Sequence, residues 1–279
     1  IPRVQPSGLS LVTANSRVLL AGIAAVAVIG PLGAGIQQLA GPDWSLRLAF
    51  VVFALGTVLA LRLPPQVDSA EGEMSARLSS DVDGGTPRRG WSIGPKVVMG
   101  LRAAASLRAF TGFLTLFLAF ALRTEPISDS LPTIAVIGLV AGAAGLGSTI
   151  GTSLGAVLSR LTPETVVTAM VALAGVGAAI GAFGYGLLPV LVTGLFAGLA
   201  GALGKLSLDA LVQREVPESV RTSAFARSET VLQLAWVAGG AIGITIPFSG
   251  QWGLGLAAAG LLAALVATVR SLVRGRARG

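Results

Sequence analysis

The sequence predicts an all-α membrane protein, a polytopic bundle of about eight transmembrane helices. Hydrophobic residues make up 53% of the 279 residues and charged residues only 12%, about half the charged share of a typical soluble domain. The mean hydropathy is +0.81, and the apolar residues gather in runs long enough to cross a bilayer, which takes about 20 residues. Much of the protein surface is therefore expected to face lipid.

Eight such runs follow one another along the chain. None carries Asp, Lys or Arg at its centre, where one such residue would cost about 2.5 to 3.5 kcal/mol. Gly184, Gly186 and Pro189 supply the turn between the fifth and sixth runs. The expected spans are residues 17–39, 44–62, 107–123, 133–157, 165–186, 188–206, 230–248 and 252–272.

A polar stretch separates two of these spans from the other six. Residues 63–95 are rich in Pro, Gly and Ser and mixed in charge, a composition typical of a flexible connection. The predicted organisation is residues 1–62 with two helices, the linker 63–95, and residues 96–279 with six helices and a tail. Residues 96–110 fit two interpretations equally, a short interfacial helix or an extension of the third span.

The distribution of Lys and Arg predicts the orientation. If both ends of the chain lie in the cytoplasm, 18 of the 20 basic residues fall on that side, and only Arg47 and Arg123 lie at the outer face. The many Ala, Gly and Arg residues resemble the products of GC-rich bacterial genomes. With the positive-inside rule, these observations predict a multi-pass protein of the bacterial inner membrane, with both ends of this chain cytoplasmic.

The composition also excludes several kinds of chemistry. The chain has no Cys and no His, so we expect no disulfide, no metal site built on thiolate or imidazole, and no cofactor. No carboxylates converge at membrane depth, so an enzyme is not expected. The net charge of +7 comes from basic residues spread between apolar runs rather than clustered with aromatic residues, so nucleic acid is not an expected partner.

A glycine–proline motif lies inside the first expected span. It consists of Gly30, Pro31, Gly33 and Gly35. Pro31 has no N–H and bends the helix, while the glycines leave a flat face that another helix can approach closely. The motif is similar to the antiporter motif of proton-driven exporters, although Ala34 stands where a glycine is expected. An ordinary kink is the alternative, because Gly and Pro are common in membrane helices.

This motif and the order of the spans together resemble the last eight helices of a twelve-helix major facilitator superfamily transporter. The resemblance implies that residues 1–62 are helices five and six, that residues 63–95 are the central cytoplasmic loop, and that residues 96–279 are a complete C-terminal half. Each half of such a transporter is built from inverted three-helix repeats.

Two further stretches resemble cytoplasmic loops of that superfamily. Residues 151–164 match its G-x-L-A-D-R-x-G loop at Gly155 and Arg160, with Ser159 in place of the Asp. Residues 205–236 resemble the loop between helices ten and eleven. The resemblance implies a cytoplasmic gate of switchable ion pairs, while ordinary positive-inside arginines and a solvated loop edge are the plainer interpretations. The gate candidates are Gly155, Arg160, Asp209, Arg214, Glu215, Arg221, Arg227 and Glu229.

A few aromatic and amide side chains are candidates for lining a substrate cavity. Phenylalanines recur at helical spacing along the third span, where core or lipid contact is the other interpretation. The cavity candidates are Gln37, Phe113, Phe117, Gln233 and Trp236.

The resemblance implies transmembrane secondary transport, the proton-coupled efflux of a hydrophobic or drug-like small molecule, by a longer chain that is monomeric when complete. The expected partners are the lipid bilayer, the small-molecule substrate and protons. An importer or facilitator of a small metabolite, or a truncated remnant that does not transport, are the alternatives. Because the resemblance leaves four helices outside this chain, we expect no transport by residues 1–279 alone.

Overall fold

A computed structural model describes residues 11–63, 76–77, 91–92, 94–158, 161–246 and 249–276. Eight helices and two very short strands occur within these ranges. The chain divides into two units, Ile1–Glu71 and Gly72–Gly279.

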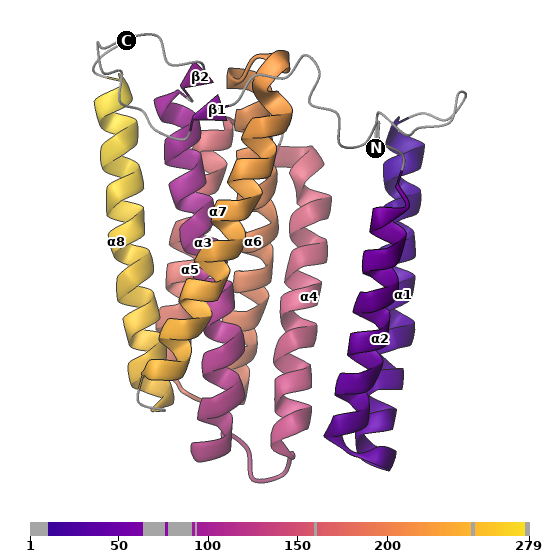
Figure 1. Ribbon diagram of the computed structural model, residues 1–279. Helices are drawn as coiled ribbons and strands as arrows, with labels where there is room; N and C mark the ends of the chain where they lie inside the picture. Colours follow the sequence, from indigo (N-terminus) through magenta and orange to yellow (C-terminus); the bar gives the residue numbers. More distant parts are fainter. Residues whose placement is uncertain are drawn as a thin grey trace. The chain divides into compact units, whose positions relative to one another are not determined.

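The first unit is a helical hairpin of α1 (Leu11–Ala40) and α2 (Pro42–Leu61) (Figure 1). Gly41 makes the turn with φ +89°, a left-handed conformation that glycine adopts without strain. The hydroxyl of Ser45 on α2 donates a hydrogen bond of 3.1 Å to the carbonyl of Gly33 on α1. Pro31 lies inside α1, as the sequence predicts.

The second unit is a bundle of six helices, and successive helices run in opposite directions (Figure 1). Proline occupies the first turn of α3 and of α5, where its missing N–H costs nothing, and glycines separate α5 from α6. The predicted turn is confirmed at Gly184 and Gly186, whereas Pro189 lies in the first turn of α6 rather than in the turn. The six helices are α3 (Pro95–Thr124), α4 (Thr133–Leu158), α5 (Pro163–Phe183), α6 (Leu187–Glu215), α7 (Glu218–Thr245) and α8 (Gly250–Arg276).

Within this bundle the helix pairs with the most extensive packing are α4 with α6 and α3 with α7. The next are α5 with α6 and α5 with α8, followed by α3 with α6 and with α8. If α3, α4 and α5 are exchanged in order with α6, α7 and α8, nearly the same pairs of helices pack together. Since each set holds three helices, equivalent helices run in opposite directions, and the contact pattern is that of an inverted three-helix repeat.

The two most extensive interfaces are built from the same backbone contacts. A Cβ on Gly112 would clash with the carbonyl of Trp236, and a Cβ on Gly239 would clash with the carbonyl of Ala109. The interface of α4 and α6 has the same reciprocal arrangement, in which Gly147 meets the carbonyl of Leu195 and Gly198 meets the carbonyl of Ala144. In all four helices the glycine follows the carbonyl residue by three positions. Only glycine lets the backbones approach this closely.

Two strands of two residues each lie in the stretch that the sequence predicts to be a linker. β1 (Ala76–Arg77) and β2 (Trp91–Ser92) pair in parallel, with Ala76 opposite Trp91 and Arg77 opposite Ser92. The composition of residues 63–95 did not predict this pairing, because a ladder of two residues leaves no periodic pattern in the sequence.

Six of the described helices are long and apolar enough to cross a membrane, namely α2 to α6 and α8. The prediction of a helical membrane bundle is confirmed to that extent. Helix α7 is outside the six, and its first half carries Glu218, Arg221, Arg227 and Glu229. The eight spans of the sequence prediction, with 17–39 and 230–248 among them, stay a prediction.

Several helices extend beyond the predicted spans. A single helix runs from Pro95 to Thr124, so residues 96–110 extend the third span rather than forming a separate interfacial helix. Helix α6 continues to Glu215, and α7 begins at Glu218. These extensions move several charged residues from the expected span ends into helix interiors.

Candidate functional site

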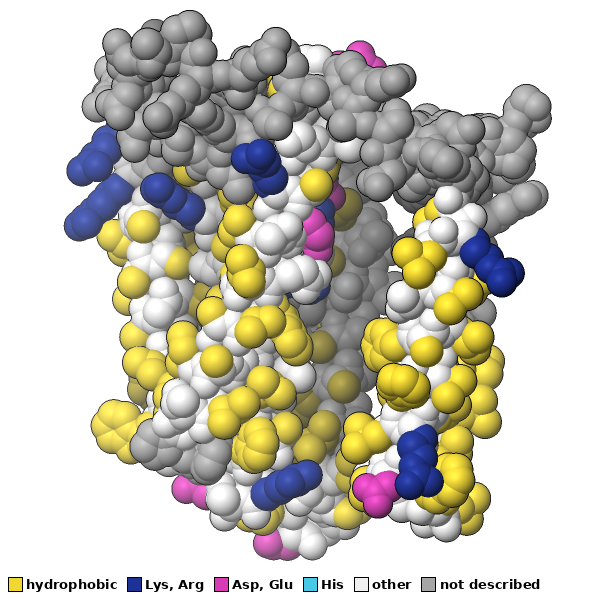
Figure 2. All heavy atoms as spheres, viewed as in Figure 1, with side chains coloured by type: hydrophobic (Ala, Val, Ile, Leu, Met, Phe, Trp, Pro, Cys, Tyr) yellow, Lys and Arg dark blue, Asp and Glu magenta, His cyan; other side chains and the backbone are white. Residues whose placement is uncertain are grey.

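Most described basic residues of the six-helix bundle lie at one end of it. We call this the basic end. It carries the α4–α5 and α6–α7 turns, the start of α3 and the end of α8. Figure 2 shows Lys and Arg side chains near this end and apolar side chains over the middle of the bundle. The opposite end carries the α3–α4, α5–α6 and α7–α8 turns and the single described cation Arg123.

Four polar side chains of α6 and α7 form a hydrogen-bonded group that we call the α6–α7 cluster. The ammonium of Lys205 lies 2.5 Å from a carboxylate oxygen of Asp209 and 3.6 Å from one of Glu229. The other oxygen of Glu229 accepts a 2.9 Å hydrogen bond from the amide of Gln233. One lysine thus serves two carboxylates, and Lys205 and Glu229 connect two helices.

The depth of this cluster follows from helix lengths. An apolar slab of about 30 Å takes about 20 residues of helix. We measure this slab along α3, α6 and α7, starting from the helix ends that lie opposite the basic end. The slab then includes Arg108, Lys205 and Glu229, and each lies within about one turn of the slab boundary nearest the basic end. Asp209 lies just beyond that boundary.

The predicted spans leave Glu229 outside and Arg108 at an end, because α3 and α7 both begin about three turns before those spans. Arg108 lies close to the midpoint of α3, and Glu229 lies close to the midpoint of α7. Since both lie near the boundary of the slab, the expectation that no charge lies at a span centre stays a prediction. An ionisable residue at such a depth is costly and usually belongs to a functional site.

A second group of charges lies at the basic end, and we call it the end cluster. The guanidinium of Arg214 pairs with Glu164 of α5 and, at 2.9 Å, with Glu215. The ammonium of Lys96 on α3 lies 3.7 Å from Glu215. One carboxylate oxygen of Glu164 is buried without a hydrogen bond. The end cluster joins α3, α5 and α6 and has no net charge.

The remaining gate candidates lie apart from these two clusters. Arg221 donates to the carbonyl of Val216, at 3.4 Å from Nε and 3.2 Å from Nη2, and so caps the end of α6. Arg227 is exposed on α7, and Gly155 packs against Leu206. Arg160 lies outside the described residues. The predicted gate is thus divided between two clusters and a helix cap.

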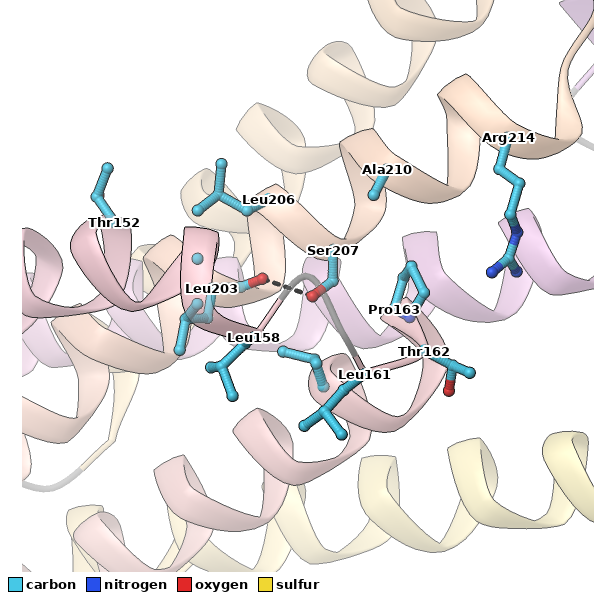
Figure 3. A pocket seen from close by; sticks show the side chains of 12 residues that line it. Thr152, Leu158, Leu161, Thr162, Pro163, Leu203, Leu206, Ser207, Ala210 and Arg214 are labelled. Atoms are coloured by element: carbon cyan, nitrogen blue, oxygen red, sulfur yellow. Dashed lines mark hydrogen bonds between the residues drawn. The ribbon is translucent and has the colours of Figure 1, made fainter.

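A cavity of about 550 Å³ lies between α4, α5 and α6 near the basic end (Figure 3). Its walls are mostly apolar. The hydroxyl of Ser207 points toward it but donates a 2.8 Å hydrogen bond to the carbonyl of Leu203, and the guanidinium of Arg214 at its rim is held by the end cluster. The cavity therefore suits an apolar guest and presents no reactive pair of side chains.

An apolar cavity of about 400 Å³ lies between α3, α7 and α8. Phe110 and Phe113 line it, and the ring of Phe113 stacks on that of Phe117 with centroids 5.0 Å apart. Phe117 is completely buried. Of the predicted cavity residues, Phe113 thus borders a cavity, Phe117 supports it from the core, and Gln233 belongs to the α6–α7 cluster. The backbone of Trp236 forms the crossing with Gly112.

The candidate residues of the first unit have few contacts. No other helix approaches Gly30, Gly33 or Gly35 within 4 Å of an added Cβ among the described residues. Gln37 is exposed near the end of α1. The role of the antiporter-like motif therefore stays a prediction.

A smaller polar group ties the turns together at the opposite end. A carboxylate oxygen of Glu125 accepts a 2.9 Å hydrogen bond from the N–H of Gly250 at the start of α8, and the hydroxyl of Tyr185 donates to the Glu125 carbonyl at 3.4 Å. Burial, followed by the charge of Glu125, raises the pKa of Tyr185 to about 12. This group fixes α8 against α3 and α5.

The sequence reasoning named Asp209, Glu229 and Gln233 but missed Lys205, Lys96 and Glu164. Lys205 and Asp209 stand four residues apart on a helix, the spacing of an ion pair, which is the signal that could have found them. Lys96 and Glu164 have no such signal, because their partners are distant in sequence. Within the described residues no three Asp or Glu side chains gather as metal ligands.

No protein-family profile matches the chain. An uncharacterized protein of Mycobacterium leprae is 30% identical over 289 aligned positions, covering 97% of this chain and 50% of the relative. An uncharacterized protein of Mycobacterium tuberculosis, present in two strains, is 31% identical over 263 positions, covering 88% of this chain and 47% of the relative. The chain spans about half the length of these relatives. Together with the fold, these findings describe a helical membrane protein similar to mycobacterial proteins about twice as long.

Proposed function

We propose that this chain is part of a secondary transporter of the major facilitator type and supplies eight of its transmembrane helices, of which α3 to α8 form one complete half. The transported substrate is a hydrophobic or drug-like small molecule, and the transporter exports it in exchange for protons. The length of the mycobacterial relatives leaves room for the four further helices that this proposal requires.

The observation that carries the proposal is the repeated glycine crossing. The crossing of α3 with α7 and that of α4 with α6 share reciprocal glycine-to-carbonyl contacts at the same spacing. An inverted three-helix repeat of this kind underlies alternating access, because the two repeats rock about a site between them. A bundle with no transport role needs no such internal symmetry.

The charges and cavities support the same proposal. Ionisable residues at membrane depth usually mark ion pathways or relays, and the α6–α7 cluster is such a group. The cavities beside α4 and α7 are apolar, which suits a hydrophobic substrate better than a sugar or a phosphate. The Gly30–Pro31 element of α1 supports export rather than import.

We further propose that the protein lies in the bacterial inner membrane with its basic end toward the cytoplasm. Lys96, Arg214, Arg221, Arg270 and Arg274 lie at this end, and Arg123 lies at the other. The positive-inside rule favours this orientation. A thiol reagent that does not cross membranes tests it, because the chain has no Cys and single cysteines can be placed at each turn.

The test of transport uses the full-length protein in sealed liposomes. An imposed pH gradient should drive the movement of fluorescent hydrophobic cations, and an ionophore that collapses the gradient should stop it. The matched comparison is the 279-residue chain alone, which should not transport because most of the first half of the cavity wall is absent from it. Absence of gradient-driven movement for the full-length protein across a panel of hydrophobic compounds would overturn the proposed function.

A further inference from the structure

The cavity of about 400 Å³ between α3, α7 and α8 opens between two helices that hardly touch. Both α7 and α8 pack on α3, but within the described residues they make very few contacts with each other. Ile242 of α7 and Leu256 of α8 line the cavity and are 52% and 53% exposed. The other large lining side chains, Phe110, Phe113 and Leu261, are buried. The cavity therefore has a buried inner wall and a mouth on the outer surface of the bundle, between α7 and α8.

The mouth lies at the depth of the membrane interior. An apolar slab of about 30 Å takes about 20 residues of helix. Phe113 lies about ten residues from the end of α3 opposite the basic end, and Gly260, which also lines the cavity, lies about ten residues from the start of α8. Both positions are near the middle of the slab, so a molecule reaches the mouth from the hydrocarbon of the bilayer rather than from water.

The internal repeat contains a second cavity of different character. Exchange of the repeats relates α3, α7 and α8 to α6, α4 and α5, and the cavity of about 550 Å³ lies between these three helices. That cavity extends beside the α4–α5 turn at the basic end, where Pro163 and the cation Arg214 line it. Of the two, the α3–α7–α8 cavity is the one whose lining lies wholly within the apolar slab. Packing symmetry provides a gap in each repeat, and the side chains decide what can enter it.

The lining of the α3–α7–α8 cavity suits an uncharged aromatic guest. The one hydroxyl among its lining residues, on Ser106, donates a 2.7 Å hydrogen bond to the carbonyl of Ala103. A charged guest would lose its hydration without gaining a partner here. The rings of Phe110 and Phe113 offer an aromatic wall, and stacking of Phe113 on the buried Phe117 holds this wall in place. A volume of about 400 Å³ is within the range of small-molecule pockets.

We propose that the α3–α7–α8 cavity binds an uncharged aromatic small molecule that enters from the bilayer between α7 and α8. Ala109 and Gly239, whose close contact holds α3 against α7, both line the cavity, so the guest touches the helix crossing itself. By filling the space between three helices, the guest stabilises their packing. Binding at this site goes beyond the proposed transport function and does not require it.

The first measurement is photolabelling of the full-length protein in lipid nanodiscs. The probe is trifluoromethylphenyl diazirine, which is aromatic and uncharged and dissolves in bilayers. Excess naphthalene should prevent most of the labelling of Phe110, Phe113 and Ile242, because a cavity holds few guests and saturates. Labelling of Leu262, which is 60% exposed on α8 and does not line the cavity, should persist because a lipid-facing position does not saturate. If naphthalene left the cavity residues as strongly labelled as Leu262, lipid chains would occupy the cavity and the proposal would be overturned.

A cavity-filling variant tests the location of the guest. A Cβ on Gly260 meets no described atom within 4 Å, so Gly260→Phe has room to place its ring at the cavity. This variant should lose the labelling that naphthalene prevents. Ala259→Phe, at an exposed neighbouring position that does not line the cavity, should keep it. Unchanged naphthalene-sensitive labelling in Gly260→Phe would place the guest elsewhere and refute the assignment.

Thermal unfolding in the same nanodiscs is the second measurement, and it also shows that each variant folds. Naphthalene should raise the unfolding midpoint of the unaltered protein and of Ala259→Phe, since a guest that binds only the folded state stabilises it. The midpoint of Gly260→Phe should not rise. No rise in the unaltered protein would contradict binding. Neither measurement involves transport, so a failure of the proposed function and a failure of this site are told apart.

Discussion

The two helix crossings of the bundle are alike in packing and different in chemistry. Gly112 and Gly239 bring α3 and α7 together through the same backbone contacts by which Gly147 and Gly198 bring α4 and α6 together. Yet α4 carries no ionisable residue, whereas its counterpart α7 carries four in its first half. The difference teaches that backbone packing is common to both repeats, while the candidate function depends on side chains added to one of them.

The largest expected effect comes from breaking the shared packing. In Gly198→Ala and in Gly239→Ala the new methyl group meets a backbone carbonyl that cannot move aside easily. Each substitution should lower the free energy of unfolding by about 2 to 3 kcal/mol, as overpacking does. Unfolding in mixed micelles with increasing SDS measures this loss for the full-length protein.

The control for this pair is Gly145→Ala on α4, where no described atom lies within 4 Å of the new methyl group. Its effect should stay within about 0.5 kcal/mol. If only one of the two crossing glycines were sensitive, the structural equivalence of the crossings would be refuted.

A smaller effect is expected from the end cluster, which lies at the basic end of the bundle. Arg214→Met removes the partner of Glu164, whose carboxylate is largely buried. We expect the free energy of unfolding to fall by about 1 to 2 kcal/mol, because the charged carboxylate of Glu164 loses its partner. Solvent reaches part of the site, which limits the loss. Glu164→Gln together with Arg214→Met should recover part of this loss, and a strictly additive double variant would show that the two side chains do not interact.

Still smaller is the expected effect of the α6–α7 pair on stability. Lys205 and Glu229 are both substantially exposed, so Lys205→Met should change the free energy of unfolding by about 1 kcal/mol or less. Its effect on gradient-driven transport should be much larger. A stability loss as great as that of Gly198→Ala would mean that the pair belongs to the packing rather than to the function.

The last expected effect belongs to the opposite end of the bundle and is absent at neutral pH. Tyr185 is the only tyrosine of the chain, so its ionisation in residues 1–279 can be followed directly by ultraviolet absorbance. The absorbance should change with a pKa of about 12 in the folded chain and near 10 after unfolding. Because the folded state then holds the proton more tightly, stability should decline as the pH rises from about 10 toward 12 and should not respond to Tyr185 below about pH 10.

The matched variant for this titration is Tyr185→Phe, which removes the absorbance change and this part of the alkaline decline. Titration of the folded chain near pH 10 would show that the half-buried surroundings of Tyr185 do not raise its pKa.

Much of the architecture followed from the sequence alone. Runs of about 20 apolar residues required helices across a membrane, since in lipid every backbone group must bond within its own helix. Gly184 and Gly186 marked a helix boundary through constraints that are local to the backbone. The excess of Lys and Arg near one end of the bundle was also readable, because charge needs no tertiary context to be counted.

Only the tertiary structure decided which glycines pack and which charges meet. Gly138 and Gly142 have the same four-residue spacing as Gly194 and Gly198, yet the first pair contacts no described neighbour and the second meets the backbone of α4. Spacing records which residues share a helix face, but it does not record which helix lies opposite. For the same reason Lys205 could be paired with Asp209 from sequence, while its contact with Glu229 depends on how α7 lies against α6.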